Sequence, residues 1–126
     1  MIYVTGAGGL VGSRFLELTD KEVVPISYRN EVPDVFESHE KSCLVHLAWS
    51  STTRNTYDDI EDVMQHDVYN TKKLFEYYVN KNPNGKIIFI SSAGDLHLGH
   101  QRTVLEGNEP SPHSLYGECK LHVENM

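Results

Sequence analysis

The sequence has few cysteines, no long apolar run and no cluster of basic residues. Its two cysteines, Cys43 and Cys119, show no metal-binding or disulfide spacing, so a reduced compartment is favoured and the cytoplasm is the expected location. No run of about eighteen apolar residues occurs, and Met1 leads directly into a strand-like pattern, so neither a membrane span nor an export signal is predicted. A net charge of -7 without a Lys/Arg cluster argues against nucleic acid as a partner.

What is present is an ordinary globular composition, with 39% hydrophobic and 23% charged residues in a chain of 126. A chain of this length can bury roughly two thirds of its unfolded surface, so we expect one domain over residues 1–126 rather than two. The negative charge still permits an anionic ligand, because amides at a helix end act locally and distant charges are screened over about 10 Å.

Strand-like runs alternate with helical periodicity along the chain. Strands are predicted at residues 1–5, 23–27, 44–48 and 86–91. The last of these runs is continuously apolar, which is typical of a strand buried on both faces. One helix follows the first strand, a short helix is predicted near Pro33, the longest runs from Tyr57 to about Lys81, and the last begins near Tyr116. The alternation predicts an α/β fold with a doubly wound, Rossmann-like parallel sheet.

A glycine-rich turn separates the first strand from its helix. Gly6, Gly9 and Gly12 recur at intervals of three. The first permits a tight turn, the second lets the backbone approach a pyrophosphate, and the third lets the helix pack closely on the strand. The free amides of the helix N-terminus then face the phosphates. A glycine triplet alone could be an ordinary flexible loop, but a strand before it and a helix after it favour binding of NAD or NADP.

Tyr116 and Lys120 form a candidate catalytic pair. Their spacing of four places a phenol and an ammonium on the same face of the last helix. A tyrosine pKa of about 10 must fall by about 3 units for proton transfer near neutrality, which requires about 4 kcal/mol. A unit charge at about 4 Å supplies about that much in a partly screened site. For such a pair in isolation, two surface side chains on an amphipathic helix would be the simpler interpretation.

Three segments resemble the extended short-chain dehydrogenase/reductase superfamily, which includes the nucleotide-sugar epimerases and dehydratases. Residues 5–12, TGAGGLVG, resemble its TGxxGxxG cofactor turn. Residues 46–49, HLAW, resemble the HLAA segment that lines its cofactor site. Tyr116 and Lys120 match its YxxxK motif, and residues 121–125 resemble the continuation of that motif. The resemblance implies an NAD(P)-dependent enzyme that acts on a nucleotide sugar.

The resemblance also implies roles for single residues. Tyr116 would exchange a proton with a sugar hydroxyl or keto group while hydride passes to or from the nicotinamide. Lys120 would hold the cofactor ribose and lower the tyrosine pKa. Ser92, or alternatively Ser91, would hydrogen-bond the reacting oxygen. The expected cofactor contacts are Gly6, Gly9, Leu10, Val11, Gly12, Arg29, Leu47, Ala48, Trp49, Asp67, Tyr116 and Lys120.

Three segments depart from the family pattern. Residues 27–30, SYRN, lack the carboxylate that NAD-preferring members offer to the ribose, unless Glu31 supplies it, and Arg29 could instead meet a 2′-phosphate of NADP or be merely solvated. In residues 67–71, DVYNT, an Asp replaces the first Asn of the family's NVxGT and an Asn replaces its Gly. Residues 96–99, LHLG, stand where the family commonly has VYG, so we expect a remodelled substrate loop.

A metal site is not expected. His97 and His100 form the tightest histidine pair, but they lie in a loop and no third ligand is apparent, so solvated histidines are favoured over zinc. The acidic residues of 58–62 stand near the start of the longest helix, where negative charge stabilises the helix dipole, and we interpret them as stabilising rather than as calcium ligands.

Length is the largest departure, because extended family members are commonly more than twice as long and carry their substrate residues after the YxxxK helix. We therefore expect a fragment or natural truncation without the substrate domain. The favoured hypothesis is the cofactor-binding part of a nucleotide-sugar epimerase, dehydratase or reductase that prepares precursors of surface polysaccharides. The alternative is a dinucleotide-binding or redox-sensing module without catalysis. The chain could also be partly unfolded or self-associate, and a homodimer would be in keeping with the family.

Overall fold

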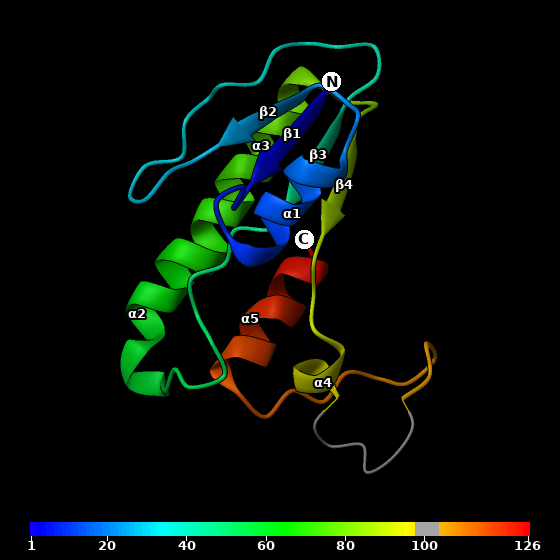
Figure 1. Cartoon of the computed structure of the whole chain (residues 1–126). Coiled ribbons are helices and arrows are strands. Elements are labelled where there is room, and N and C mark those ends of the chain that lie inside the picture. Colours follow the sequence, from blue (N-terminus) through cyan, green and yellow to red (C-terminus); the bar gives the residue numbers. More distant parts are fainter. Residues whose placement is uncertain (98–103) are drawn as a thin grey trace. The chain divides into compact units, whose positions relative to one another are not determined.

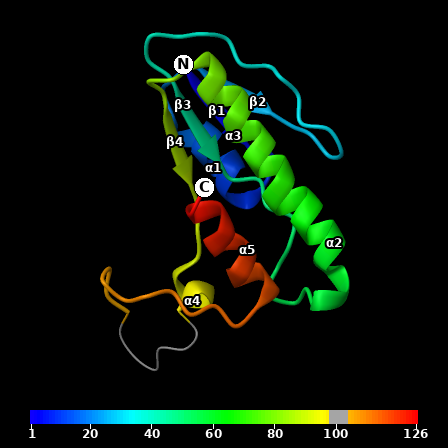
Figure 2. The same ribbon diagram turned by 180° about the vertical axis from the view of Figure 1, so that it is seen from behind.

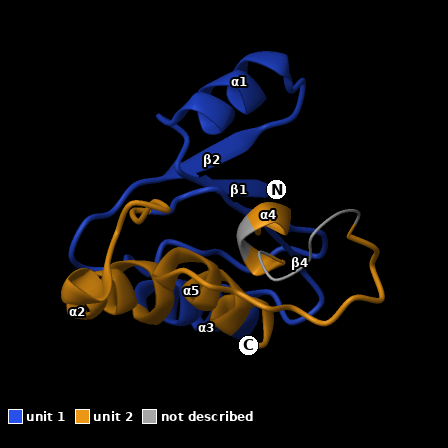
Figure 3. Cartoon of the chain, turned by 90° about the horizontal axis from the view of Figure 1, so that it is seen from below, with its two compact units in different colours: residues 1–49, 70–90 blue, residues 50–69, 91–126 orange. Residues whose placement is uncertain are grey.

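A computed structural model describes residues 1–97 and 104–126 of the chain, except for the side chain of Asp95. The described residues form two compact units, which Figure 3 shows in different colours. The first unit consists of residues 1–49 and 70–90, and the second consists of residues 50–69 and 91–126.

The first unit contains a parallel four-stranded sheet. Its strands are β1 (Ile2–Thr5), β2 (Val23–Ile26), β3 (Cys43–His46) and β4 (Lys86–Phe89). The strand order is β2-β1-β3-β4, and every neighbouring pair is parallel (Figure 1). Parallel neighbours require a crossover between consecutive strands, and helices provide it after β1 and before β4. The predicted Rossmann-like fold with a parallel sheet is therefore confirmed.

Helices α1 (Leu10–Leu18) and α3 (Asn70–Lys81) cover opposite faces of this sheet (Figures 1 and 2). The α3 face holds the hydrophobic core. There the fully buried Leu74 and Tyr78 of α3 pack against residues of the strands and of the segment after β2, which are Tyr3, Ile26, Val32, Phe36 and Leu44. The ring of Tyr3 meets that of Phe36 edge to face, with the centroids 5.0 Å apart, a favourable arrangement for two aromatic quadrupoles.

Strand β4 differs from its prediction in length and in burial. It ends at Phe89, and Ile88 and Ile90 are each 48% exposed, so the expectation of a strand buried on both faces is wrong. Alternate side chains of a strand point to opposite faces. Ile87 packs against the core on the α3 face, whereas Ile88 belongs to the opposite face and is about half exposed.

The segment between β2 and β3 contains no helix, so the short helix predicted near Pro33 is wrong. Val32 and Phe36 are buried in the core, and side chains from other elements bind the backbone of this segment instead. The Tyr3 hydroxyl accepts a hydrogen bond from the amide of Glu37 at 3.1 Å, and the Asn82 side chain donates to the carbonyl of Glu37 at 2.9 Å. Long-range anchors thus replace the local hydrogen bonds of a helix.

The predicted long helix is present as an unbroken run of helical residues from Tyr57 to Lys81. The run changes type, from the short 3₁₀ segment η1 (Tyr57–Asp59) through α2 (Ile60–Val63) and the π-helical segment η2 (Met64–Tyr69) to α3. Thr56 begins it with a capping box, in which the Asp59 carboxylate accepts a hydrogen bond from the Thr56 amide at 3.0 Å. That bond and one from Asn55 lower the pKa of Asp59, with the Asn55 bond the larger cause. Asp59 thus caps the start of the helix, and stabilisation of the helix dipole by the whole acidic run stays a prediction.

The second unit ends with two further helices, α4 (Ala93–Leu96) and α5 (Leu115–Glu124). The Ser114 hydroxyl caps α5 by accepting a hydrogen bond from the amide of Gly117 at 3.0 Å. The predicted start of the last helix near Tyr116 is thus confirmed. Within residues 1–97 and 104–126, no helix combines the length and the hydropathy that crossing a membrane demands.

Candidate functional site

The glycine turn after β1 is closed by backbone contacts that leave no room for side chains. Gly6 has a φ of +67°, and a Cβ there would lie 2.7 Å from the amide nitrogen of Ala48. The amide of Gly9 donates a hydrogen bond to the Gly6 carbonyl at 3.0 Å. At Gly12, which is buried, a Cβ would lie 2.1 Å from that same carbonyl oxygen. Gly6 and Gly12 therefore hold the turn, β1 and α1 at separations that only glycine permits.

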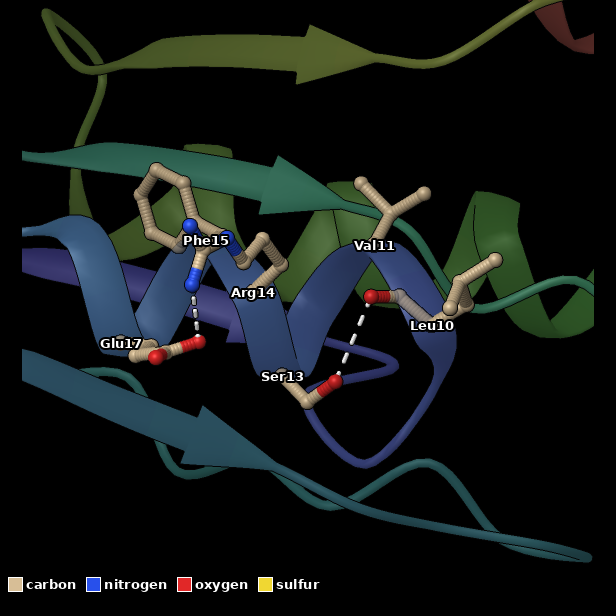
Figure 4. A pocket seen from close by; sticks show the side chains of 6 residues that line it. All are labelled: Leu10, Val11, Ser13, Arg14, Phe15 and Glu17. Carbon is tan, nitrogen blue, oxygen red and sulfur yellow. Dashed lines mark hydrogen bonds and ion pairs between the residues drawn. The ribbon is translucent and has the colours of Figure 1, made fainter.

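The N-terminus of α1 has no side-chain cap. Gly9 is the N-cap residue, and no side chain of the described residues caps the amides of the first turn. Leu10 and Val11 are 91% and 62% exposed. Figure 4 shows their side chains beside a groove of about 620 Å³ that is lined entirely by residues of α1, where the Ser13 hydroxyl donates to the Leu10 carbonyl. The uncapped amides are therefore available to an acceptor such as a phosphate oxygen.

A cavity of about 160 Å³ lies beside the glycine turn. It is lined by Gly6, Ala7, Gly8, Pro25, Ile26, Ser27, Tyr28 and Ala48. These residues follow the carboxyl ends of β1 and β3 and include the end of β2. Since β1 has β2 on one side and β3 on the other, the chain changes direction across the sheet at this point, which is where open α/β sheets bind ligands. Arg29, the candidate ligand of a 2′-phosphate, is exposed and directly follows Tyr28.

The segment after β3 is tied to the end of β1. The Thr5 hydroxyl, which is buried, accepts hydrogen bonds from the amides of Leu47 at 3.2 Å and Ala48 at 3.1 Å. Trp49 is half-buried, and its ring centroid lies 5.7 Å from that of Phe89. The structure thus brings Leu47 and Ala48 to the glycine turn, and Ala48 to the cavity.

Tyr116 and Lys120 of α5 lie together in the second unit. The Lys120 ammonium is 5.5 Å from the centroid of the Tyr116 ring, so the expectation that they share a helix face is confirmed. On α3, Lys73 lies at the same 5.5 Å from the ring of Tyr77. The distance between ammonium and ring therefore does not distinguish the two pairs. The burial of Lys120 does, because this side chain is only 4% exposed.

Burial changes the acidity of Lys120. It lowers the pKa of the ammonium from 10.5 to about 8, and the negative charge of Asp67 partly opposes this effect. A buried lysine with a depressed pKa is costly to the folded state and is more typical of functional sites than of helix surfaces. The ammonium is still mostly charged at pH 7.

We expect this burial to make stability depend on pH. The folded pKa is depressed, so the unfolded chain binds more protons at this group between about pH 8 and 10.5, and the contribution of Lys120 to stability rises with pH across that window. At about 1.36 kcal/mol per unit, this contribution rises by about 3 kcal/mol. Cys119 acts in the opposite direction, because burial raises the pKa of its thiol to about 11. Urea unfolding at pH 7 and pH 10.5 should therefore show a change in stability that is more favourable by about 3 kcal/mol in the wild type and in the exposed control Lys72→Met than in Lys120→Met. An equal change in all three proteins would contradict the burial cost.

Asp67 binds the loop that precedes the long helix. Its carboxylate is buried and accepts three hydrogen bonds, from the amide and the hydroxyl of Ser50, each at 2.7 Å, and from the amide of Ser51 at 2.8 Å. The residue lies in the π-helical segment η2, a type of distortion that is frequent at functional sites. Both carboxylate oxygens are occupied by this loop, and the predicted contact of Asp67 with a cofactor stays a prediction.

Ser91 and Ser92 follow β4 and are both half-buried. Ser92 is the N-cap residue of α4, and its carbonyl accepts a hydrogen bond from the amide of Leu96 at 3.3 Å. The Ser91 hydroxyl is buried without a hydrogen-bond partner among the described residues. An unsatisfied buried hydroxyl costs about 1–3 kcal/mol and calls for a reason. This observation favours Ser91 as the alternative to Ser92, the residue first expected to hydrogen-bond the reacting oxygen.

Thr5 and His46 were not predicted as site residues, although both stand within the two motifs that resemble the family. Each is the last residue of a buried strand, and each has a polar side chain that is at most 1% exposed. A polar residue that ends an apolar strand beside the glycine turn was the available signal.

Of the histidine pair considered as metal ligands, only His97 belongs to the described residues, because His100 lies outside them, as do Leu98 and Gly99 of the expected substrate loop. Within residues 1–97 and 104–126, no three His, Cys, Asp or Glu side chains gather closely enough to hold a metal ion.

Comparisons with known proteins found a family whose model covers nearly the whole chain. The family model described as "NAD dependent epimerase/dehydratase family" matches residues 2–126. A search among curated proteins found no match.

Several solved structures are similar to the whole chain. They include MoeE5 in complex with UDP-glucuronic acid and NAD, with a TM-score of 0.77 and 26% identity over 98% of this chain. RMD from Pseudomonas aeruginosa, complexed with NADPH, has a TM-score of 0.71 and 20% identity over 98% of this chain. TunA, an NAD-dependent NDP-hexosamine 5,6-dehydratase, has a TM-score of 0.76 and 18% identity over 98% of this chain. The match spans 47% of each of these three proteins, so this chain is about half their length.

Proposed function

Because this chain belongs to the NAD-dependent epimerase/dehydratase family, we propose that it binds NAD or NADP at the glycine turn after β1. The observation that carries the proposal is the geometry of that turn. Gly6 and Gly12 exclude any side chain, and the first amides of α1 have no cap beside a cavity at the carboxyl end of the sheet. Such an arrangement supplies donors and space where a pyrophosphate needs both.

The pyrophosphate and the adenosine each have a matching element in the first unit. The amides of Leu10 and Val11 would donate to the pyrophosphate, and the cavity beside residues 25–28 would hold the adenosine. Arg29 follows this cavity, and its guanidinium would meet a 2′-phosphate through paired donors, which supports NADP. The backbone of Leu47 and Ala48 would border the other side of the ligand.

The chemistry that we propose is hydride transfer between the nicotinamide and a nucleotide sugar. When bound, the cofactor accepts or supplies the hydride. Tyr116 would exchange a proton with a sugar hydroxyl or keto group, and Lys120, charged at neutral pH and 5.5 Å from the ring centroid, would favour the phenolate. Ser92, or Ser91, whose hydroxyl has no hydrogen-bond partner within the described part of the chain, would hydrogen-bond the reacting oxygen. Burial of Lys120 supports this proposal, because burying an ammonium costs stability and a lysine with only a surface role would not bear that cost.

The first test is calorimetric titration of the chain with NAD and with NADP. We expect saturable binding of at least one cofactor by the wild type. Gly9→Trp should abolish it, because a Cβ at that position already lies 3.3 Å from the Gly6 carbonyl oxygen and a bulky ring would fill the phosphate turn. Gly107→Trp is the matched control, since nothing lies within 4 Å of a Cβ there.

The outcomes separate the proposals. A tighter complex with NADP that Arg29→Gln equalises would support the role of Arg29. If a wild-type chain with a folded circular dichroism spectrum binds neither cofactor, the proposed function fails for this chain. If the longest natural polypeptide that contains this sequence binds a cofactor but turns over no nucleotide sugar, the non-catalytic dinucleotide-binding module is the better description.

A further inference from the structure

The first unit contains a buried histidine with hydroxyl groups at both ring nitrogens. His46 ends β3 and is 1% exposed. Its Nδ1 lies 2.8 Å from the Oγ1 of Thr5, at the end of β1, and its Nε2 lies 3.0 Å from the Oγ1 of Thr71, in the first turn of α3. The ring also stacks on Phe89, with the centroids 6.0 Å apart. The imidazole therefore joins two strands and a helix.

Counting hydrogens assigns the direction of each bond. A threonine hydroxyl has one hydrogen and two lone pairs. The Oγ1 of Thr5 accepts from the amides of Leu47 and Ala48, which occupies both lone pairs. Its single hydrogen must therefore point to the Nδ1 of His46, so that this nitrogen is an acceptor and carries no proton. The hydrogen of a neutral ring is then on Nε2 and is donated to Thr71.

The two amides held in this way border the proposed cofactor site. Ala48 lines the cavity beside the glycine turn, and a Cβ on Gly6 would lie 2.7 Å from the Ala48 nitrogen. A displacement of residues 47–48 would therefore change this wall of the site. The hydroxyl that holds them has a single orientation only while the ring nitrogen beside it accepts its hydrogen.

We infer that His46 is a positioning residue of the cofactor site. As a neutral imidazole with its hydrogen on Nε2, it orients the Thr5 hydroxyl, and this hydroxyl holds the amides of Leu47 and Ala48 against the glycine turn. The identity of the ligand rests on the proposed function, but the hydrogen-bond relay from Thr71 through His46 to Thr5 does not. The relay explains why two polar side chains lie buried between apolar strands.

The relay is tested by nuclear magnetic resonance of the ¹⁵N-labelled chain at pH 7. Long-range ¹H–¹⁵N spectra of the imidazole should show the tautomer with the hydrogen on Nε2. The amides of Leu47 and Ala48 should be protected from hydrogen exchange. Thr5→Ser, which keeps the hydroxyl, should preserve both signatures. Thr5→Val, which keeps the shape without the hydroxyl, should speed exchange of the two amides about tenfold or more and weaken cofactor binding about tenfold or more, because it leaves them without an acceptor.

Three results would overturn the inference. One is a ring with its hydrogen on Nδ1, or a doubly protonated ring, in the wild type. Another is unchanged exchange of the two amides in a folded Thr5→Val. The third is unchanged cofactor affinity in Thr5→Val when the wild type binds. If the wild type binds no cofactor, the proposed function fails while tautomer and exchange still decide the relay. If Thr5→Val does not fold, the wild-type tautomer and the Thr5→Ser comparison decide it.

Discussion

Replacing Tyr116 with phenylalanine should lower turnover about 10²- to 10⁴-fold in the longest natural polypeptide that contains this sequence, while cofactor affinity stays within about twofold. The proposed proton donor is lost, but the ring that lies 5.5 Å from the Lys120 ammonium remains. Steady-state kinetics with a nucleotide sugar would measure the first quantity, and calorimetric titration with NAD or NADP would measure the second.

The matched control for this variant is Tyr77→Phe. The ring of Tyr77 lies at the same distance, 5.5 Å, from the Lys73 ammonium, but on α3 and away from the YxxxK motif. It should leave turnover unchanged within about twofold. Equal losses in both variants would show a structural effect of removing a phenol, and full activity of Tyr116→Phe would exclude the proton transfer. A tenfold or greater loss of cofactor affinity would instead assign the hydroxyl to cofactor binding.

Replacing Gly12 with alanine should lower the free energy of unfolding by about 3 kcal/mol, the upper end of the usual cost of overpacking. The added methyl group would lie 2.1 Å from the Gly6 carbonyl oxygen and 2.8 Å from the Ala7 Cα. Both are backbone atoms, so no side-chain rotation relieves the clash, and α1 must move away from β1. Urea unfolding followed by circular dichroism measures the change.

Gly8→Ala is the control for Gly12→Ala in the same turn, since nothing lies within 4 Å of a Cβ at Gly8. We expect a change within about 0.5 kcal/mol for this exposed position. A Gly12→Ala protein as stable as Gly8→Ala would mean that the turn does not need the close approach of α1 and β1, which would remove the main structural support for a phosphate turn.

The candidate site could be predicted from the sequence to the extent that its residues are close together in the chain. The spacing of Gly6, Gly9 and Gly12 between a strand and a helix depends only on local backbone geometry. The same holds for Tyr116 and Lys120, which share a face because they are four residues apart on one helix. The structure confirms both local arrangements.

Partners distant in the chain could not be predicted in this way. Nothing near Asp67 indicates that its carboxylate binds the backbone of Ser50 and Ser51, and nothing near Thr5 indicates that its hydroxyl binds residues 47–48. Both depend on how segments more than fifteen residues apart meet in the fold. For the same reason His46 was recognised only as part of a motif, because the hydrogen bonds of its ring with Thr5 and Thr71 span 41 and 25 residues.

By itself, the sequence determined the parallel α/β fold, the glycine turn and the tyrosine–lysine pair, because periodicity, glycine and helical spacing act over a few residues. Only the tertiary structure decided that Ile88 of β4 is about half exposed, that the segment after β2 is anchored by Tyr3 and Asn82 rather than helical, and that Lys120 is buried. Burial and long-range hydrogen bonds depend on which surfaces meet, and sequence patterns specify which residues are apolar without specifying what covers them.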